Sequence, residues 1–157
     1  MIGKLLGESA QAAALREMKA IDPSFRLPEL VELAEHVIAP HLVHSFLNGD
    51  REALKIQCGE AAYAAVDHSI KERDTLKLSL DPTVLLLRNV EFKGASTMPD
   101  KAPWFIFTFT AQQINCMRDK DDRVVVGAID DIREVVYSVA LMKHPDPEIA
   151  GLEYPWQ

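Results

Sequence analysis

The sequence predicts an α+β domain, with helices in the first half and a strongly twisted antiparallel sheet in the second. Up to residue 80, apolar side chains recur at helical spacing between proline and glycine breaks. From residue 83 onward, aromatic and β-branched residues alternate with polar ones, which is the period of a half-buried strand. Helices that precede all the strands are typical of α+β folds and not of alternating α/β folds.

The first predicted element is an amphipathic helix over residues 1–21. Its apolar residues recur loosely at helical spacing, with cations placed between them. Asp22 and Pro23 are expected to end it, because proline lacks the amide donor and forces an extended residue before it. We therefore divide the chain into this helix and an α+β domain over residues 22–157.

The second predicted helix begins at Pro28, a residue suited to a first helical turn. Pro40 removes one helical hydrogen bond, so a kink is expected near His36–Pro40. Asn48 and Gly49 tolerate positive φ and should end this helix.

Two further helices are predicted before the strands begin. Asp50 is placed to cap a short helix over Arg51–Cys58, which Gly59 then breaks. A longer helix is expected over Glu60–Thr75, with its apolar side chains on one face.

The remaining chain predicts an antiparallel sheet. The expected strands are Thr83–Phe92, Trp104–Met117, Arg123–Val126 and Ile132–Lys143. Gly94–Pro99 and Arg118–Asp122 are expected to turn the chain, and Gly127 with Asp130 and Asp131 to form a bulge or break. Trp156 could begin a last strand.

The strand Trp104–Met117 is the most informative element. Phe105, Phe107, Phe109 and Ala111 share one face at a period of two. About 14 residues would span about 45 Å at 3.3 Å each, which is far longer than a usual strand. The strand must therefore curve or bulge, and such sheets usually enclose a helix or a pocket.

Composition excludes several classes of function. A net charge of −7 over 157 residues disfavours nucleic-acid binding, which needs clustered cations. Two cysteines indicate a reducing compartment and no disulfide scaffold. No apolar run approaches the ~20 residues of a membrane span, and no signal peptide is evident.

The candidate chemical groups do not form a reactive site. Three histidines lie close together in sequence without converging carboxylates, which argues against a metal site: His36, His41 and His44. Cys58 and His68 lack an orienting partner for nucleophilic catalysis. On the buried strand face only Tyr137 and Asn115 could act on a proton, so we predict no catalytic residue, metal or cofactor.

An apolar pocket for an acyl chain or an apolar peptide face is one interpretation of the aromatic strand face. It would lie between the kinked helix and the sheet, and its expected lining is Tyr63, Val66, Phe105, Phe107, Phe109, Val139 and Leu141. The alternative is an ordinary filled core, because aromatic stripes normally mean packing.

Four segments carry a family resemblance in the same order along the chain: MKAIDPSFRLPELVE, IAPHLVHSFLNGDREALKIQCGEAAY, LDPTVLLLRNVEF and FTFTAQQINCMRDKDDRVVVG. They resemble the Tim44-like domain family, whose namesake is the peripheral matrix-side subunit of the mitochondrial presequence translocase. The resemblance implies helices packed on a twisted antiparallel sheet, in the nuclear-transport-factor-two-like or cystatin-like manner.

The resemblance also implies a function. It suggests a non-enzymatic adaptor of the mitochondrial import motor, on the matrix side of the inner membrane, that links presequence translocase subunits to the matrix heat-shock chaperone and contacts presequences or cardiolipin. Weak membrane contact would fall on Ile2, Lys4, Leu5, Leu6, Leu15, Arg16, Met18 and Lys19. The alternative for this segment is a helix that only packs against the protein.

Two other functions remain open for the same domain. Relatives in the family include a mitochondrial ribosomal protein, although ribosomal contact calls for a basic surface and this chain is acidic. The chain could also be an accessory structural subunit of an inner-membrane assembly.

Overall fold

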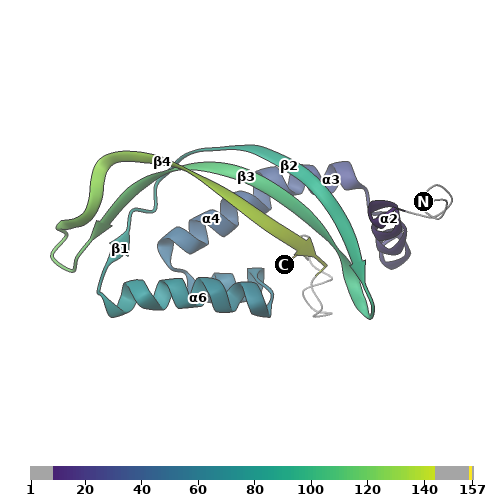
Figure 1. Ribbon diagram of the computed structural model, residues 1–157, viewed down its shortest axis with the longest axis horizontal. Helices are drawn as coiled ribbons and strands as arrows, with labels where there is room; N and C mark the ends of the chain where they lie inside the picture. The colour runs from purple at the N-terminus through teal and green to yellow at the C-terminus, as the bar shows by residue number, and fades with distance from the viewer. Residues whose placement is uncertain (1–8, 144–155, 157) are drawn as a thin grey trace. The chain divides into compact units, whose positions relative to one another are not determined.

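The computed structural model describes residues 9–143 and 156, and all its helices precede its strands (Figure 1). The predicted α+β class is confirmed. The chain forms two units. Unit 1 contains the described residues of 1–34, 90–108 and 138–157, and unit 2 contains residues 35–89 and 109–137.

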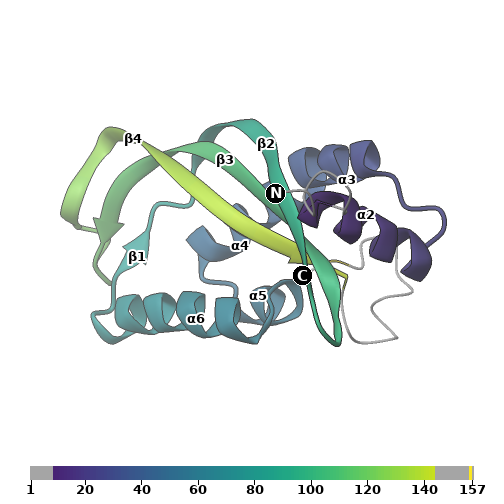
Figure 2. The ribbon, with the colours of Figure 1, turned by 45° about the vertical axis from the view of Figure 1, so that its right-hand side comes forward.

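The first described helix is α2, Ala10–Ile21, in unit 1. Ser9 caps it, because its Oγ accepts a hydrogen bond from the Ala12 amide at 3.1 Å. Asp22 follows as the C-cap, as the Asp-Pro pair predicted. Both views place α2 beside α3 (Figures 1 and 2).

The predicted proline interruption is a π-helical turn. Helix α3, Leu27–Leu33, runs into the π turn η1, Ala34–Ile38, which leads into α4, Ala39–Asn48. Pro40 has no amide to donate to the carbonyl of His36, and the wider π turn accommodates the missing bond. The position of the interruption is therefore confirmed.

Helices α5, Arg51–Gln57, and α6, Glu60–Thr75, complete the helical part of unit 2. Gly49 ends α4 with φ 68°, and Asp50 Oδ1 accepts from the Ala53 amide at 3.1 Å. Helix α5 packs on both α4 and α6. Within unit 2, α4 and α6 lie on the same side of the strands (Figures 1 and 2).

Strand β3 is the centre of the sheet. It pairs with every other strand of the four-stranded sheet, whose members are β1, Ser79–Leu80; β2, Val84–Met98; β3, Lys101–Arg118; and β4, Val124–Met142. In the antiparallel pairing of β1 with β3, Ser79 lies opposite Arg118.

The predicted turn over Gly94–Pro99 is wrong, since β2 continues through it to Met98. Gly94 stays in the strand at φ 156°, and Ala95 is buried within it. The turn is instead the pair Pro99 and Asp100. Asp100 has φ 61°, and proline followed by a positive-φ residue is the pattern of a type II turn.

Of the bulge or break predicted near Gly127, the break is wrong, because β4 is continuous. Gly127 has φ 70°, and a Cβ built there would lie 1.8 Å from the backbone oxygen of Asn115 on β3. The glycine therefore allows an irregular backbone and a close strand approach without ending the strand. Asn115 also donates to Asp131 at 2.9 Å, so one of the two acids binds the neighbouring strand.

The predicted buried face of β3 is confirmed. Phe105, Phe107, Phe109 and Ala111 are at most 1% exposed. Trp156 pairs with Lys143 as an isolated antiparallel bridge, where the sequence predicted the start of a last strand. Within the described ranges, every helix is too short or too polar to cross a membrane.

Candidate docking site

The predicted membrane-contact residues fall into two groups. Ile2, Lys4, Leu5 and Leu6 lie outside the described residues. On α2, Arg16 and Lys19 are exposed, Leu15 is half-buried and Met18 is fully buried.

Helix α2 has a cationic outer face and an apolar inner face. Ala14 and Met18, four residues apart, are both 0% exposed and point into unit 1. Ala12, Arg16 and Lys19 are exposed at spacings of four and three, so they share the opposite face. In this arrangement Met18 cannot reach a bilayer, and the described part of the helix exposes Arg16 and Lys19 together with one large apolar side chain, Ile21.

Asp22 organises the turn that follows α2. Its amide donates to the Met18 carbonyl at 2.8 Å, and its Oδ1 accepts from the amide of Ser24 at 3.0 Å and from its hydroxyl at 2.6 Å. Oδ2 lies 3.6 Å from Lys143 Nζ. Hydrogen bonds from Ser24, with a smaller contribution from Lys143, lower the pKa of Asp22.

An aromatic cluster fixes the same turn to the sheet of unit 1. The Phe25 ring lies 5.3 Å from Phe105 and 6.1 Å from Trp156, measured between centroids. Trp156 also meets Phe105 edge to face at 6.1 Å. Three segments that are distant in sequence therefore meet in one cluster of Phe25, Phe105 and Trp156.

The unit 1 members of the predicted pocket are packed against other side chains. Phe92 lies 6.4 Å from Phe105 and 5.5 Å from Phe107. Leu141 is buried and Val139 is half-buried. The aromatic rings therefore have packing partners within unit 1.

In unit 2, Phe109 stacks on Tyr137 at 5.1 Å, while Tyr63 and Val66 are half-buried. The apolar pocket as a whole stays a prediction.

A buried polar pair on the inner sheet face was not expected. Gln113, 9% exposed, donates from Nε2 to the Tyr137 hydroxyl, and burial raises the pKa of Tyr137. A signal for it existed, because Gln113 continues the period-two face that begins at Phe105. The bond satisfies two polar groups beside apolar rings and leaves the tyrosine neutral at physiological pH.

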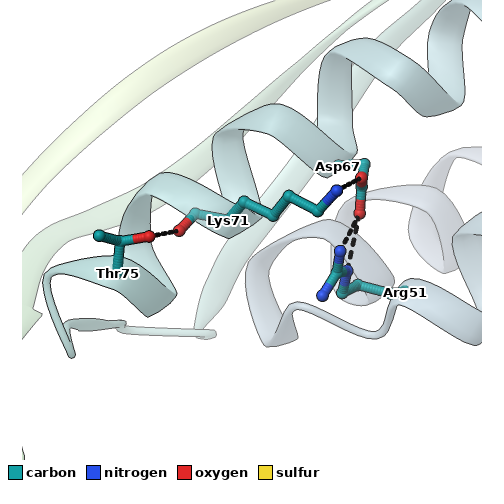
Figure 3. A network of polar contacts seen from close by, with 4 residues as sticks. All are labelled: Arg51, Asp67, Lys71 and Thr75. Carbon is teal, nitrogen blue, oxygen red and sulfur yellow. Dashed lines mark hydrogen bonds and ion pairs between the residues drawn. The ribbon is translucent and has the colours of Figure 1, made fainter.

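The charged groups of α5 and α6 form a structural contact (Figure 3). Asp67 accepts from Arg51 Nε at 2.7 Å and lies 2.6 Å from Arg51 Nη2 and 3.0 Å from Lys71 Nζ. Hydrogen bonds from Lys71 and Arg51 lower the pKa of Asp67. Thr75 donates to the Lys71 carbonyl. Among residues 9–143 and 156, no group of three or more His, Cys, Asp and Glu could hold a metal ion.

Exposed apolar side chains on β4 form a second candidate surface, which the sequence did not predict. We define the β4 apolar surface by its large side chains, each more than two-fifths exposed: Val124, Val125, Val126, Ile129, Ile132 and Val136. All belong to unit 2. Because successive side chains of a strand point to opposite faces, these exposed groups lie on both faces of β4. Exposed apolar side chains in such number are a feature of strands that contact another molecule.

A family model, the Tim44-like domain, matches residues 11–157. The chain belongs to the Tim44-like domain family. The match includes most of α2, all later helices and the whole sheet.

The Tim44-like chain is similar to curated proteins named mitochondrial import inner membrane translocase subunit TIM44. The Homo sapiens protein is 27% identical over 93% of this chain and 32% of its own length. The Arabidopsis thaliana protein TIM44-1 is 28% identical over 93% of this chain and 30% of its own length. The Tim44-like chain thus spans about a third of these relatives.

Proposed function

We propose that this Tim44-like domain is a non-enzymatic docking domain of the mitochondrial import machinery, on the matrix side of the inner membrane. The observation that carries the proposal is the family match over residues 11–157, together with relatives named as import inner membrane translocase subunits. The partners would be presequence translocase subunits and the matrix heat-shock chaperone.

The side chains support docking more than catalysis. The inner face of β3 is lined by phenylalanine and alanine, and its buried Gln113 is hydrogen bonded to Tyr137. Asp22, Asp67 and Asp131, whose pKa values are lowered, are each held in contacts that stabilise the fold. The β4 apolar surface supplies an exposed region that a partner could bury.

Copurification from mitochondria tests the partner class. The tagged chain is expected to retain translocase subunits or the matrix heat-shock chaperone, and a variant with Val126→Asp and Ile129→Asp to lose them, because a charge on an apolar interface must be desolvated. A control with Glu60→Gln and Glu72→Gln, both on the exposed side of α6, should keep them. Retention of ribosomal or respiratory subunits alone would contradict the proposal.

Membrane contact is the second part of the proposal. Lys19 and Arg16 on the outer face of α2 are suited to cardiolipin phosphates, and Lys4 and the apolar residues of 1–8 would add to them. About 1 kcal/mol per cation near an anionic surface predicts weak binding.

Flotation with cardiolipin-containing phosphatidylcholine vesicles tests the membrane contact. Deletion of residues 1–20 is expected to abolish retention, and Lys19→Glu to weaken it more than Lys101→Glu, an exposed position on β3. Equal retention of the full and the shortened chains would remove the membrane role from this segment.

A further inference from the structure

We propose that α2 is held closed by a latch between its C-terminal turn and the last residues of the chain, and that opening of this latch releases the buried side chain of Met18. We define the latch by Asp22, Phe25, Lys143 and Trp156. The inference rests on the proposed membrane contact of α2 and adds its regulation.

Few side chains of α2 are fully buried. Of its 12 residues only Ala14 and Met18 are buried, and methionine is the larger of the two. The two cations Arg16 and Lys19 are on the exposed side, together with Ala12 and Ala20. Ala13, Leu15 and Glu17 are half-buried, and the turn that follows the helix adds to the contacts that hold it closed.

The polar half of the latch is the contact between Asp22 and Lys143. Asp22 is at once the C-cap of α2, the acceptor that shapes the Ser24 turn and the partner of Lys143. The side chains of Asp22 and Lys143 are 32% and 20% exposed, so the pair is partly shielded from water. Any movement of Lys143 acts directly on the residue that ends the helix.

The aromatic half comes from the same place in the chain. Trp156 is bridged to Lys143 in antiparallel pairing, and its ring contacts both Phe25 and Phe105. Phe25 is 6% exposed. Lys143 and Trp156 are neighbours in space. They contact Asp22 and Phe25, which lie three residues apart in the turn.

The latch gives α2 two ways to meet an anionic lipid surface. In the closed form the helix presents Lys19, Arg16 and the exposed Ile21 at its end, so contact with the surface is mainly electrostatic. In the open form Met18 and Ala14 become available, and an amphipathic helix with a free apolar face inserts into the interface. Opening should therefore strengthen membrane binding even where it removes a positive charge.

Charge reversal at Lys143 tests the latch, with Lys101→Glu as the matched control for net charge. Lys101 is exposed in the same unit. Hydrogen exchange of the whole chain should show amides of α2 exchanging several-fold faster in Lys143→Glu than in wild type or Lys101→Glu, with α6 unchanged. Trp156→Ala provides a second variant that should show the same local effect without a change of charge.

Flotation with cardiolipin-containing phosphatidylcholine vesicles separates the latch from the membrane contact. Lys143→Glu is expected to bind several-fold more strongly than wild type, whereas Lys101→Glu should bind equally or more weakly. Unchanged exchange of α2 in both latch variants would overturn the latch. Faster exchange without vesicle binding by any variant would support the latch and overturn the proposed membrane contact.

Discussion

At the scale of single residues, the clearest requirement is at Gly127. Its positive φ suits glycine, and a Cβ would collide with the Asn115 carbonyl on β3. The sequence indicated an irregularity here, and only the strand pairing shows that it is a close approach inside a continuous strand.

Replacement of Gly127 by alanine is expected to lower the free energy of unfolding by about 2 kcal/mol or more, because both the backbone conformation and the contact become unfavourable. Urea unfolding measures the change. Gly94→Ala is the comparison, since Gly94 also has a positive φ, 156°, but nothing lies within 4 Å of a Cβ there, so only Gly127 adds the close contact. An effect at Gly127 no larger than at Gly94 would show that the close approach is not rigid.

Asp67 gives a pH-dependent prediction at the same scale. Its pKa is lowered by Lys71 and Arg51, so its contribution to stability is present above the unfolded-state pKa and is lost as pH falls through the folded-state pKa. Asp67→Asn should therefore be less stable than wild type at pH 7, and the difference should shrink below about pH 4.

Urea unfolding as a function of pH measures this difference. Glu52→Gln on α5, an exposed residue, serves as the control and should follow wild type throughout. A difference between wild type and Asp67→Asn that is constant with pH would show that the contacts of Asp67 do not depend on its charge.

At the scale of elements, local signals predicted the helices well. Helix ends were predicted from Gly49 and Asp50, and the place of the π turn was predicted from the prolines. These signals are local, because a cap or a missing amide donor acts within a few residues. Strand limits were predicted less well. A glycine such as Gly94 or Gly127 can end a strand or lie within it. Pairing with the neighbouring strand determines which of the two occurs.

Contacts between elements were beyond the reach of local patterns. Arg73 on α6 donates to the carbonyls of Phe46 and Leu47 at the end of α4, with its guanidinium 5.4 Å from the Phe46 ring centroid. The residues are more than 25 positions apart, and the sequence gives no signal for the pairing. The same holds for Asp22 and Lys143.

Substitution of the α5 cap tests the element scale. Asp50→Ala should cost about 1 kcal/mol of unfolding free energy, because the Ala53 amide loses its acceptor. Asp50→Ser should recover most of this loss, since serine also caps helices. Equal losses for both variants in urea unfolding would show that the carboxylate matters in some other way.

At the scale of the whole molecule, the buried and the exposed faces differ in how far the sequence predicted them. The buried aromatic face of β3 was predicted because apolar and polar residues alternate along the strand, which is the pattern of a strand with one buried face. The β4 apolar surface was not, because a valine-rich strand is equally compatible with burial. The docking proposal assigns partner binding to this exposed surface.

Surface variants should separate docking from stability. Ile129→Asp is expected to change the free energy of unfolding by no more than about 0.5 kcal/mol, because the side chain is 64% exposed. Urea unfolding of the purified variant measures this. A loss of several kcal/mol would instead mark Ile129 as part of the fold.

Site-specific photo-crosslinking in isolated mitochondria tests the central claim most directly. A photoreactive side chain at Ile129 or Ile132 is placed on the β4 apolar surface, and one at Glu72 on the exposed side of α6 is the control. The account predicts crosslinks from the β4 positions, and not from Glu72, to subunits of the inner membrane import translocase. Crosslinks confined to ribosomal or respiratory proteins, or equal from all three positions, would contradict it.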